Sequence, residues 1–146
     1  MKKSFTMIEL IFVIVIIGIL AGVAIPRLFT GISDAEIAKV KSDVATIRTA
    51  ISTKYGKNVM AGNNACPDLE TSTSDNKLFE NILSYPIKRN SGNVKWDGNG
   101  TDYNVSAENK TIHFNYVKDP DGRGCLFECN SSLSTDSDFN CSTIGE

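Results

Sequence analysis

Glu9 is the only charged residue in the apolar run of residues 5–25. Lys2 and Lys3 precede this run, and Pro26 follows it. A charged side chain in such a segment costs about 2.5–3.5 kcal/mol to insert into a bilayer, so Glu9 is expected to have a cationic partner. The run itself contains no Lys or Arg. The partner must therefore come from another chain or be created by processing.

Processing at the Ser4–Phe5 bond would create such a cation, because the new α-amino group of Phe5 is protonated near neutral pH. The carboxylate of Glu9 would then lie four residues from a positively charged N-terminus. As a helix, the run from Phe5 to Ile25 would span roughly the 30 Å hydrocarbon layer, at about 1.5 Å per residue. The sequence therefore predicts a membrane helix with one intramembrane ion-pairing group.

The segment from Lys2 to Leu10, together with the apolar run and Pro26, resembles the class III signal of type IV pilins and type II secretion pseudopilins. The resemblance covers about the first third of the chain. It implies that a prepilin peptidase cleaves after Ser4 and methylates Phe5, and that Glu9 is the carboxylate used in assembly. Ser4 departs from the family pattern, in which Gly usually precedes the cleaved bond.

Two other interpretations of the N-terminal segment remain open. A secretory signal peptide also combines basic residues, an apolar run and a small-residue cleavage site, for which residues 22–24 would serve. A plain single-pass membrane anchor is the second. Glu9 argues against both, because a carboxylate at the start of the apolar run has no use in either.

The segment after Pro26 is amphipathic, with apolar residues mostly three and four positions apart, which predicts a helix with one buried face. These apolar residues are Leu28, Ile32, Ala35, Val40, Val44, Ile47, Ile51 and Tyr55. Gly56 and Asn58 mark its expected end, and Pro26 would kink the chain without ending the helix. A continuous helix over residues 5–55 would be roughly 75–80 Å long. Its first half must lie in lipid or among copies of itself.

The sequence predicts loops and a sheet for the rest of the chain, apart from a short helix that could form over residues 76–84. Turn signals at residues 97–100 and 107–109 separate three extended segments. We expect these segments to form an antiparallel meander, over residues 93–96, 101–105 and 111–117. The predicted fold is α+β and pilin-like: a long N-terminal helix packed on a small antiparallel sheet, with a disulfide-bonded C-terminal loop.

The cysteines are even in number and absent from the membrane half, which is typical of an oxidising location. They are Cys66, Cys125, Cys129 and Cys141, and they allow three pairings. We favour Cys129 with Cys141, a loop that resembles the C-terminal disulfide loop of many type IV pilins, and Cys66 with Cys125. Zinc is disfavoured, because the two-residue gap of zinc knuckles is missing and no His is close in sequence. The only His, His113, is expected to be structural.

Two further patterns suggest surface chemistry. Four acids near the C-terminus could surround a calcium ion, although a solvated turn is the interpretation we favour; they are Asp119, Asp121, Asp136 and Asp138. Four Asn-x-Ser/Thr triplets have an acid two residues before the Asn, at Asn99, Asn104, Asn130 and Asn140. This extended acceptor resembles the one used by bacterial oligosaccharyltransferases, but the same residues are also simply turn formers.

Charge divides the chain into a basic stem and an acidic head. Residues 27–57 hold six Lys or Arg and three acids, whereas residues 58–146 hold seven and thirteen. An acidic head is not expected to bind nucleic acid, where neutralisation of phosphates dominates affinity. We expect four parts, namely a leader, a transmembrane polymerisation helix, an amphipathic helical half and a globular head, over residues 1–4, 5–26, 27–57 and 58–146.

These features favour a structural subunit over an enzyme, with no cofactor required. By resemblance, the first expectation is a pseudopilin of a type II secretion or DNA-uptake system, and the alternative is a type IV pilus pilin for adhesion or motility. The implied partners are further pilin-like subunits, the prepilin peptidase and an inner-membrane platform with a cytoplasmic ATPase. The chain would span the bacterial inner membrane once, with a periplasmic head, before entering the fibre. A membrane-anchored binding domain that never polymerises is the remaining class.

Overall fold

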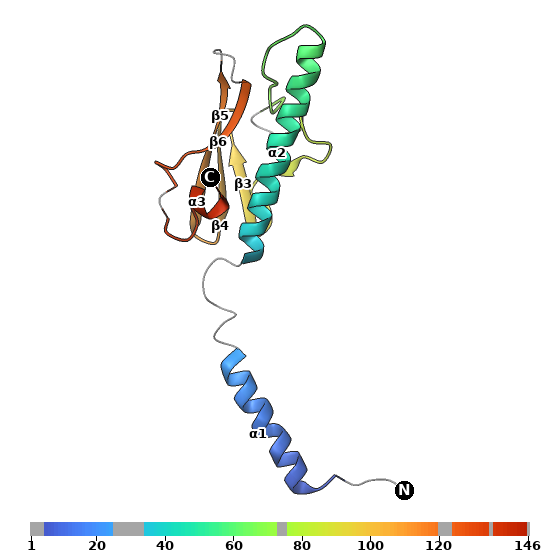
Figure 1. Cartoon of the computed structure of the whole chain (residues 1–146), viewed down its shortest axis with the longest axis vertical. Helices are drawn as coiled ribbons and strands as arrows, with labels where there is room; N and C mark the ends of the chain where they lie inside the picture. Colours follow the sequence, from blue (N-terminus) through green and yellow to red (C-terminus); the bar gives the residue numbers. More distant parts are fainter. Residues whose placement is uncertain (1–4, 25–33, 73–75, 120–123, 135, 146) are drawn as a thin grey trace. The chain divides into compact units, whose positions relative to one another are not determined.

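The computed structural model forms two units, Met1–Gly31 and Ile32–Glu146 (Figure 1). Helix α1 belongs to the first, and all other elements belong to the second. The structure describes residues 5–24, 34–72, 76–119, 124–134 and 136–145. Pro26 and the predicted junction between the two helical halves lie outside this part of the chain. The kink and the continuity of a single long helix stay predictions.

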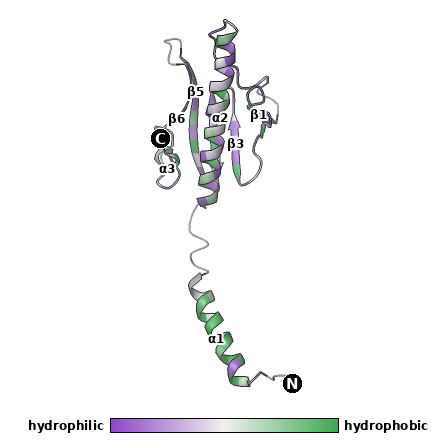
Figure 2. Ribbon diagram, turned by 45° about the vertical axis from the view of Figure 1, so that its right-hand side comes forward, coloured by the Kyte–Doolittle hydropathy of each residue, from purple (hydrophilic) through white to green (hydrophobic). Residues whose placement is uncertain are grey.

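Helix α1 spans Met7–Ala24 and begins where the carbonyl of Thr6 accepts the amides of Glu9 and Leu10. Its large apolar side chains up to Leu20 are at least 41% exposed and occupy every face of the helix. Figure 2 shows α1 as mostly hydrophobic, with one hydrophilic stretch near its N-terminal end. Within the described residues, no helix has the length and apolarity needed to cross a membrane. The predicted segment, residues 5–26, is longer than the 18 residues of α1.

Helix α2 spans Asp34–Met60 and buries the predicted stripe, Val40, Val44, Ile47 and Ile51. Acidic side chains in its first turn and Lys57 in its last suit the helix dipole. The expected end near Tyr55 is wrong, since the helix continues through Gly56. It stops at Gly62, which has a φ of +80° and lies in a left-handed cap. The amides of Gly62 and Asn63 there bond the carbonyls of Val59 and Asn58.

The predicted helix over residues 76–84 is also wrong. This segment holds β1, Lys77–Leu78, which pairs antiparallel with β2, Ile87–Lys88. Phe79 follows β1 with a φ of +62°, a left-handed conformation that interrupts any helix. Its side chain is fully buried and contacts the rings of Trp96, Tyr103 and Phe127. Burial of this aromatic ring outweighs the local helix preference.

The main sheet is antiparallel, with strands in the order β3-β4-β5-β6. The strands are Val94–Gly98, Asp102–Ala107, Lys110–Asp119 and Gly124–Cys129. The first three correspond to the predicted meander with small shifts at their ends. The fourth, β6, was missed because only Phe127 in it is buried, so the strand has no apolar alternation to read.

The core lies between the buried stripe of α2 and one face of this sheet. Its centre is aromatic: the Phe114 and Phe127 rings stack with centroids 5.1 Å apart, and the Phe79 and Tyr103 rings stack at 4.7 Å. Arg48 on α2 donates from Nε and Nη2 to the carbonyl of Phe127 on β6, at 2.8 and 2.7 Å. The α+β, pilin-like fold class is confirmed.

Candidate assembly segment and the head that carries it

The candidate assembly segment is α1 together with Phe5. Glu9 lies in the first turn of α1, where a carboxylate is stabilised by the unpaired amides and the positive end of the helix dipole. Its side chain is exposed, and Phe5 is 78% exposed. The cleavage residue Ser4 lies outside the described residues. An exposed carboxylate next to an exposed apolar surface is suited to pairing with a cation on a second molecule.

One hollow of the head lies between α2 and residues 82–87, and its lining is mostly apolar. Among the described residues that line it, Asp43 and Tyr85 are the ionisable ones. The Asp43 carboxylate is already occupied: Oδ2 accepts from Lys39 Nζ at 2.8 Å and from Trp96 Nε1 at 3.0 Å. The hollow therefore lacks the convergent polar groups expected of a catalytic pocket.

A second cluster joins the loop before β1 to the sheet. The Glu70 side chain is 2% exposed, and its Oε2 lies 3.7 Å from Nη2 of Arg89. Burial raises the pKa of Glu70 above its ordinary value, while the nearby Tyr103 hydroxyl and Arg89 oppose that rise. Arg89 also pairs with Asp97 on β3. Nothing in the sequence pattern around Glu70 predicted this buried carboxylate, because its neighbours are Arg89, directly after β2, and Tyr103 on β4.

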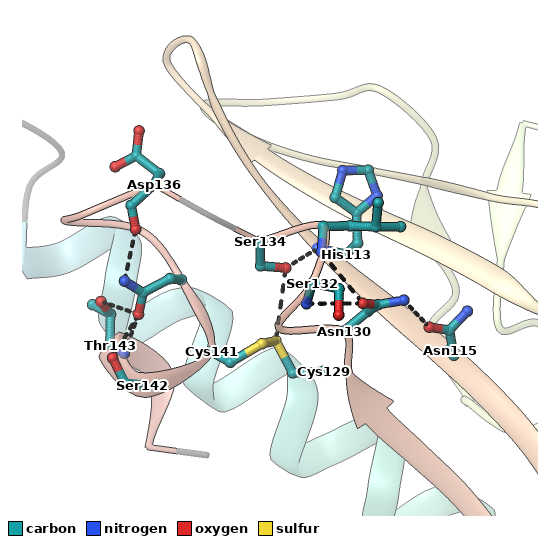
Figure 3. Close-up of a disulfide and its surroundings, with 12 residues drawn as sticks. His113, Asn115, Cys129, Asn130, Ser132, Ser134, Asp136, Cys141, Ser142 and Thr143 are labelled. Carbon is teal, nitrogen blue, oxygen red and sulfur yellow. Dashed lines mark hydrogen bonds between the residues drawn. A yellow bond between two sulfur atoms is a disulfide. The ribbon is translucent and has the colours of Figure 1, made fainter.

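The disulfides join Cys66 to Cys125 and Cys129 to Cys141, the pairing favoured from the sequence. Figure 3 shows the second bond beside the turn that follows β6. The buried Ser134 hydroxyl accepts the amide of His113 at 2.9 Å. His113 thus meets this turn through its backbone, as its expected structural role requires.

Three of the four calcium candidates, Asp119, Asp136 and Asp138, lie in the described part of the chain. Asp136 and Asp138 both bind Lys110, at 3.1 and 2.9 Å. The backbone amide of Asp138, and after it Lys110, hold the pKa of the Asp136 carboxyl below its ordinary value. Lys110 also lowers the pKa of the Asp138 carboxyl. Asp119 ends β5, and Asp121 lies outside the described residues. No group of three acidic, His or Cys side chains suited to a metal occurs among the described residues.

Comparison with known proteins favours one interpretation of the N-terminal segment. The prokaryotic N-terminal methylation motif matches residues 1–25. A type IV major fimbrial protein of Dichelobacter nodosus is 42% identical over 67 residues. This match covers 42% of this chain and 43% of the relative. The N-terminal part of the chain is therefore similar to type IV pilins.

Two further relatives have pilus names. Fimbrial protein Q of Moraxella bovis is 34% identical over 91 residues, or 57% of this chain and 56% of the relative. A type IV narrow pilus major component of Thermus thermophilus is 48% identical over 48 residues, 33% of this chain and 41% of the relative. The chain thus spans about half the length of these relatives or less. No solved structure matches it.

Proposed function

We propose that this chain is a pilin, a structural subunit of a type IV pilus-like fibre. The single observation that carries the proposal is the apolar surface of α1, whose large side chains up to Leu20 are exposed on every face of the helix. An apolar surface of this extent marks a membrane or protein interaction site. The methylation motif over the same residues supports assembly through this helix.

Residues 5–26 would lie in the inner membrane as a single span before assembly, with the head on the periplasmic side. After cleavage behind Ser4, the methylated amine of Phe5 on an incoming subunit would pair with Glu9 of a neighbour. The amine and the carboxylate would then neutralise each other when the subunit leaves the lipid. Such a buried pair acts through registry more than through net stability. The four proposed parts keep their predicted boundaries, with residues 1–4 as the leader.

The prepilin peptidase, an assembly platform and a cytoplasmic ATPase are the proposed partners. Between the two kinds of fibre, the pilus names of the relatives and the Cys129–Cys141 loop favour a type IV pilus over a type II secretion or DNA-uptake pseudopilus. The small head is the feature that supports the pseudopilus. The intact mass of the protein from membranes tests processing: the expected N-terminus is methylated Phe5, and a chain beginning at Met1 or Ile25 would contradict it.

Replacing Glu9 by Val tests assembly. The variant should insert in the membrane and fold its head normally, because Glu9 belongs to a different unit from the head and the change removes a charge from lipid. Fibre formation should be lost or strongly reduced, since the Phe5 amine of the next subunit would be desolvated without a partner. The measurement is the amount of sheared filament at equal membrane levels of protein.

Glu128→Val is the matched control, because Glu128 is exposed on β6 and the substitution is the same. It should assemble like the unmodified chain. Normal filaments from the Glu9→Val protein would refute the proposed pairing and favour a membrane-anchored binding domain that does not polymerise.

A further inference from the structure

The four acidic Asn-x-Ser/Thr triplets occupy different structural settings. An oligosaccharyltransferase needs an acceptor Asn whose side-chain nitrogen is free and whose backbone can enter the enzyme, so acceptors belong on surface loops. The triplets can therefore be distinguished by the hydrogen bonds of each Asn amide and by the strand pairing around it.

In two of the four triplets, the side-chain nitrogen of the Asn already donates a hydrogen bond. Nδ2 of Asn130 donates to Oδ1 of Asn115 at 2.8 Å, and the Asn130 side chain is partly buried (Figure 3). Nδ2 of Asn140 donates to the carbonyl of Asp136 at 2.6 Å, while its Oδ1 caps α3 (Cys141–Ile144) by accepting the amide of Thr143. Each Asn also adjoins a disulfide-bonded cysteine. Both are structural links of the C-terminal turn.

Asn104 is held by its backbone. It lies in the middle of β4, opposite Asp97 on β3 and His113 on β5. Both of its neighbouring strands would have to separate before the triplet could enter an enzyme groove. In the folded head this triplet is therefore inaccessible as a peptide, although its Asn side chain is only half-buried.

Asn99 differs from the other three. It is exposed at the tip of the β3–β4 hairpin, next to Gly100, which has a φ of +94°. Its Oδ1 accepts the amide of Asp102 at 2.9 Å and the hydroxyl of Thr101 at 3.2 Å. Within the described residues Nδ2 donates no hydrogen bond. A glycan on Nδ2 would therefore leave the hydrogen bonds of the hairpin intact.

We propose that Asn99 is the N-glycosylation acceptor of the folded head. The donor class is an oligosaccharide carried on a polyprenyl diphosphate. A bond forms between Nδ2 and the anomeric carbon, the bond from that carbon to the diphosphate oxygen breaks, and the diphosphate leaves with the electron pair while Nδ2 loses a proton. The proposal requires only that the head reach the extracytoplasmic side, and it does not depend on fibre formation.

The chain contains its own control for the acidic residue. Asn109-Lys110-Thr111 is also an Asn-x-Thr triplet, and Asn109 is exposed in the turn between β4 and β5. Two residues before it stands Ala107, where the Asn99 triplet has Asp97. The two hairpin tips therefore compare an acceptor with and without the acid on one molecule.

The experiment expresses the full chain in a bacterium supplied with an oligosaccharyltransferase of the acidic-acceptor type and a lipid-linked oligosaccharide of known mass. Intact mass should rise by one glycan, which peptide mapping should place on Asn99. The increment should be lost in Asn99→Gln and in Thr101→Ala, and kept in Thr101→Ser. Asn109 should remain unmodified.

A second version of the chain carries a copy of residues 97–101 at its C-terminus, which shows whether the enzyme reaches the protein. Modification of that copy with an unmodified Asn99 would overturn the proposal. So would a glycan on Asn104, Asn130, Asn140 or Asn109 that persists in the Asn99→Gln variant. Modified Asn99 in a chain that forms no fibres would support this inference while contradicting the proposed function.

Discussion

Helices α1 and α2 bury their apolar side chains in different ways. In α2 the apolar residues form a single stripe, Val40, Val44, Ile47 and Ile51, that the sheet covers within the same unit. In α1 the large apolar side chains up to Leu20 lie on every face of the helix and are exposed. The stability of α2 can therefore be understood from this chain alone. In the proposed function, the environment of α1 comes from lipid or from other subunits.

The largest expected effect concerns the disulfides, which all lie in the unit of α2. Replacing Cys66 and Cys125 by Ala should lower the free energy of unfolding by roughly 4 kcal/mol, because this bond joins residues 59 positions apart. The same change at Cys129 and Cys141, 12 positions apart, should cost roughly 3 kcal/mol in the chain-entropy account. Urea unfolding followed by Trp96 fluorescence measures both. An equal or reversed ranking would contradict the loop-length argument.

The next prediction compares one substitution in the two helices. Ile47→Ala should destabilise the head by about 3 kcal/mol, because Ile47 is fully buried and its truncation leaves a cavity. Ile14→Ala in α1 should leave head unfolding unchanged, since Ile14 is 60% exposed and contributes nothing to that core. A loss of head stability in the Ile14 variant would show that the two helices are energetically coupled.

A smaller effect is expected on the polar edge of α2. Asp43→Ala should cost about 1–3 kcal/mol, because it leaves the indole N–H of the buried Trp96 without its acceptor. Lys39→Ala removes only the exposed ion pair to the same carboxylate and should cost about 0.5 kcal/mol or less. The same urea titration distinguishes the two. Equal losses would indicate that the ion pair, rather than the indole contact, matters.

The smallest expected effect is a pH dependence in the free energy of unfolding of the head. Because burial raises the pKa of Glu70 in the folded head above its ordinary value of 4.5, the folded state holds a proton that the unfolded chain has released. The free energy of unfolding should therefore fall as pH rises from 4.5 through the raised pKa. Glu70→Gln should remove that part of the slope. An unchanged slope in the variant would assign it to other groups.

Local patterns were sufficient for much of this protein. The period of apolar residues predicted the buried face of α2, and the turn-forming residues 97–100 and 107–109 predicted two hairpins, because both signals are written in consecutive residues. The N-terminal motif likewise needed no tertiary structure, since it is read in consecutive residues that precede the head. The even cysteine count indicated disulfides but left three pairings open.

Long-range packing decided the rest. The left-handed Phe79 replaced a plausible helix, because its ring fills the aromatic core formed by β3, β4 and β6. The partners of Glu70 and the fourth strand likewise depend on residues distant in the chain. The sequence alone determined which residues could pair, turn or accept a glycan. Only the tertiary structure decided which of them were already occupied, because hydrogen-bond partners and burial are set by contacts between distant segments.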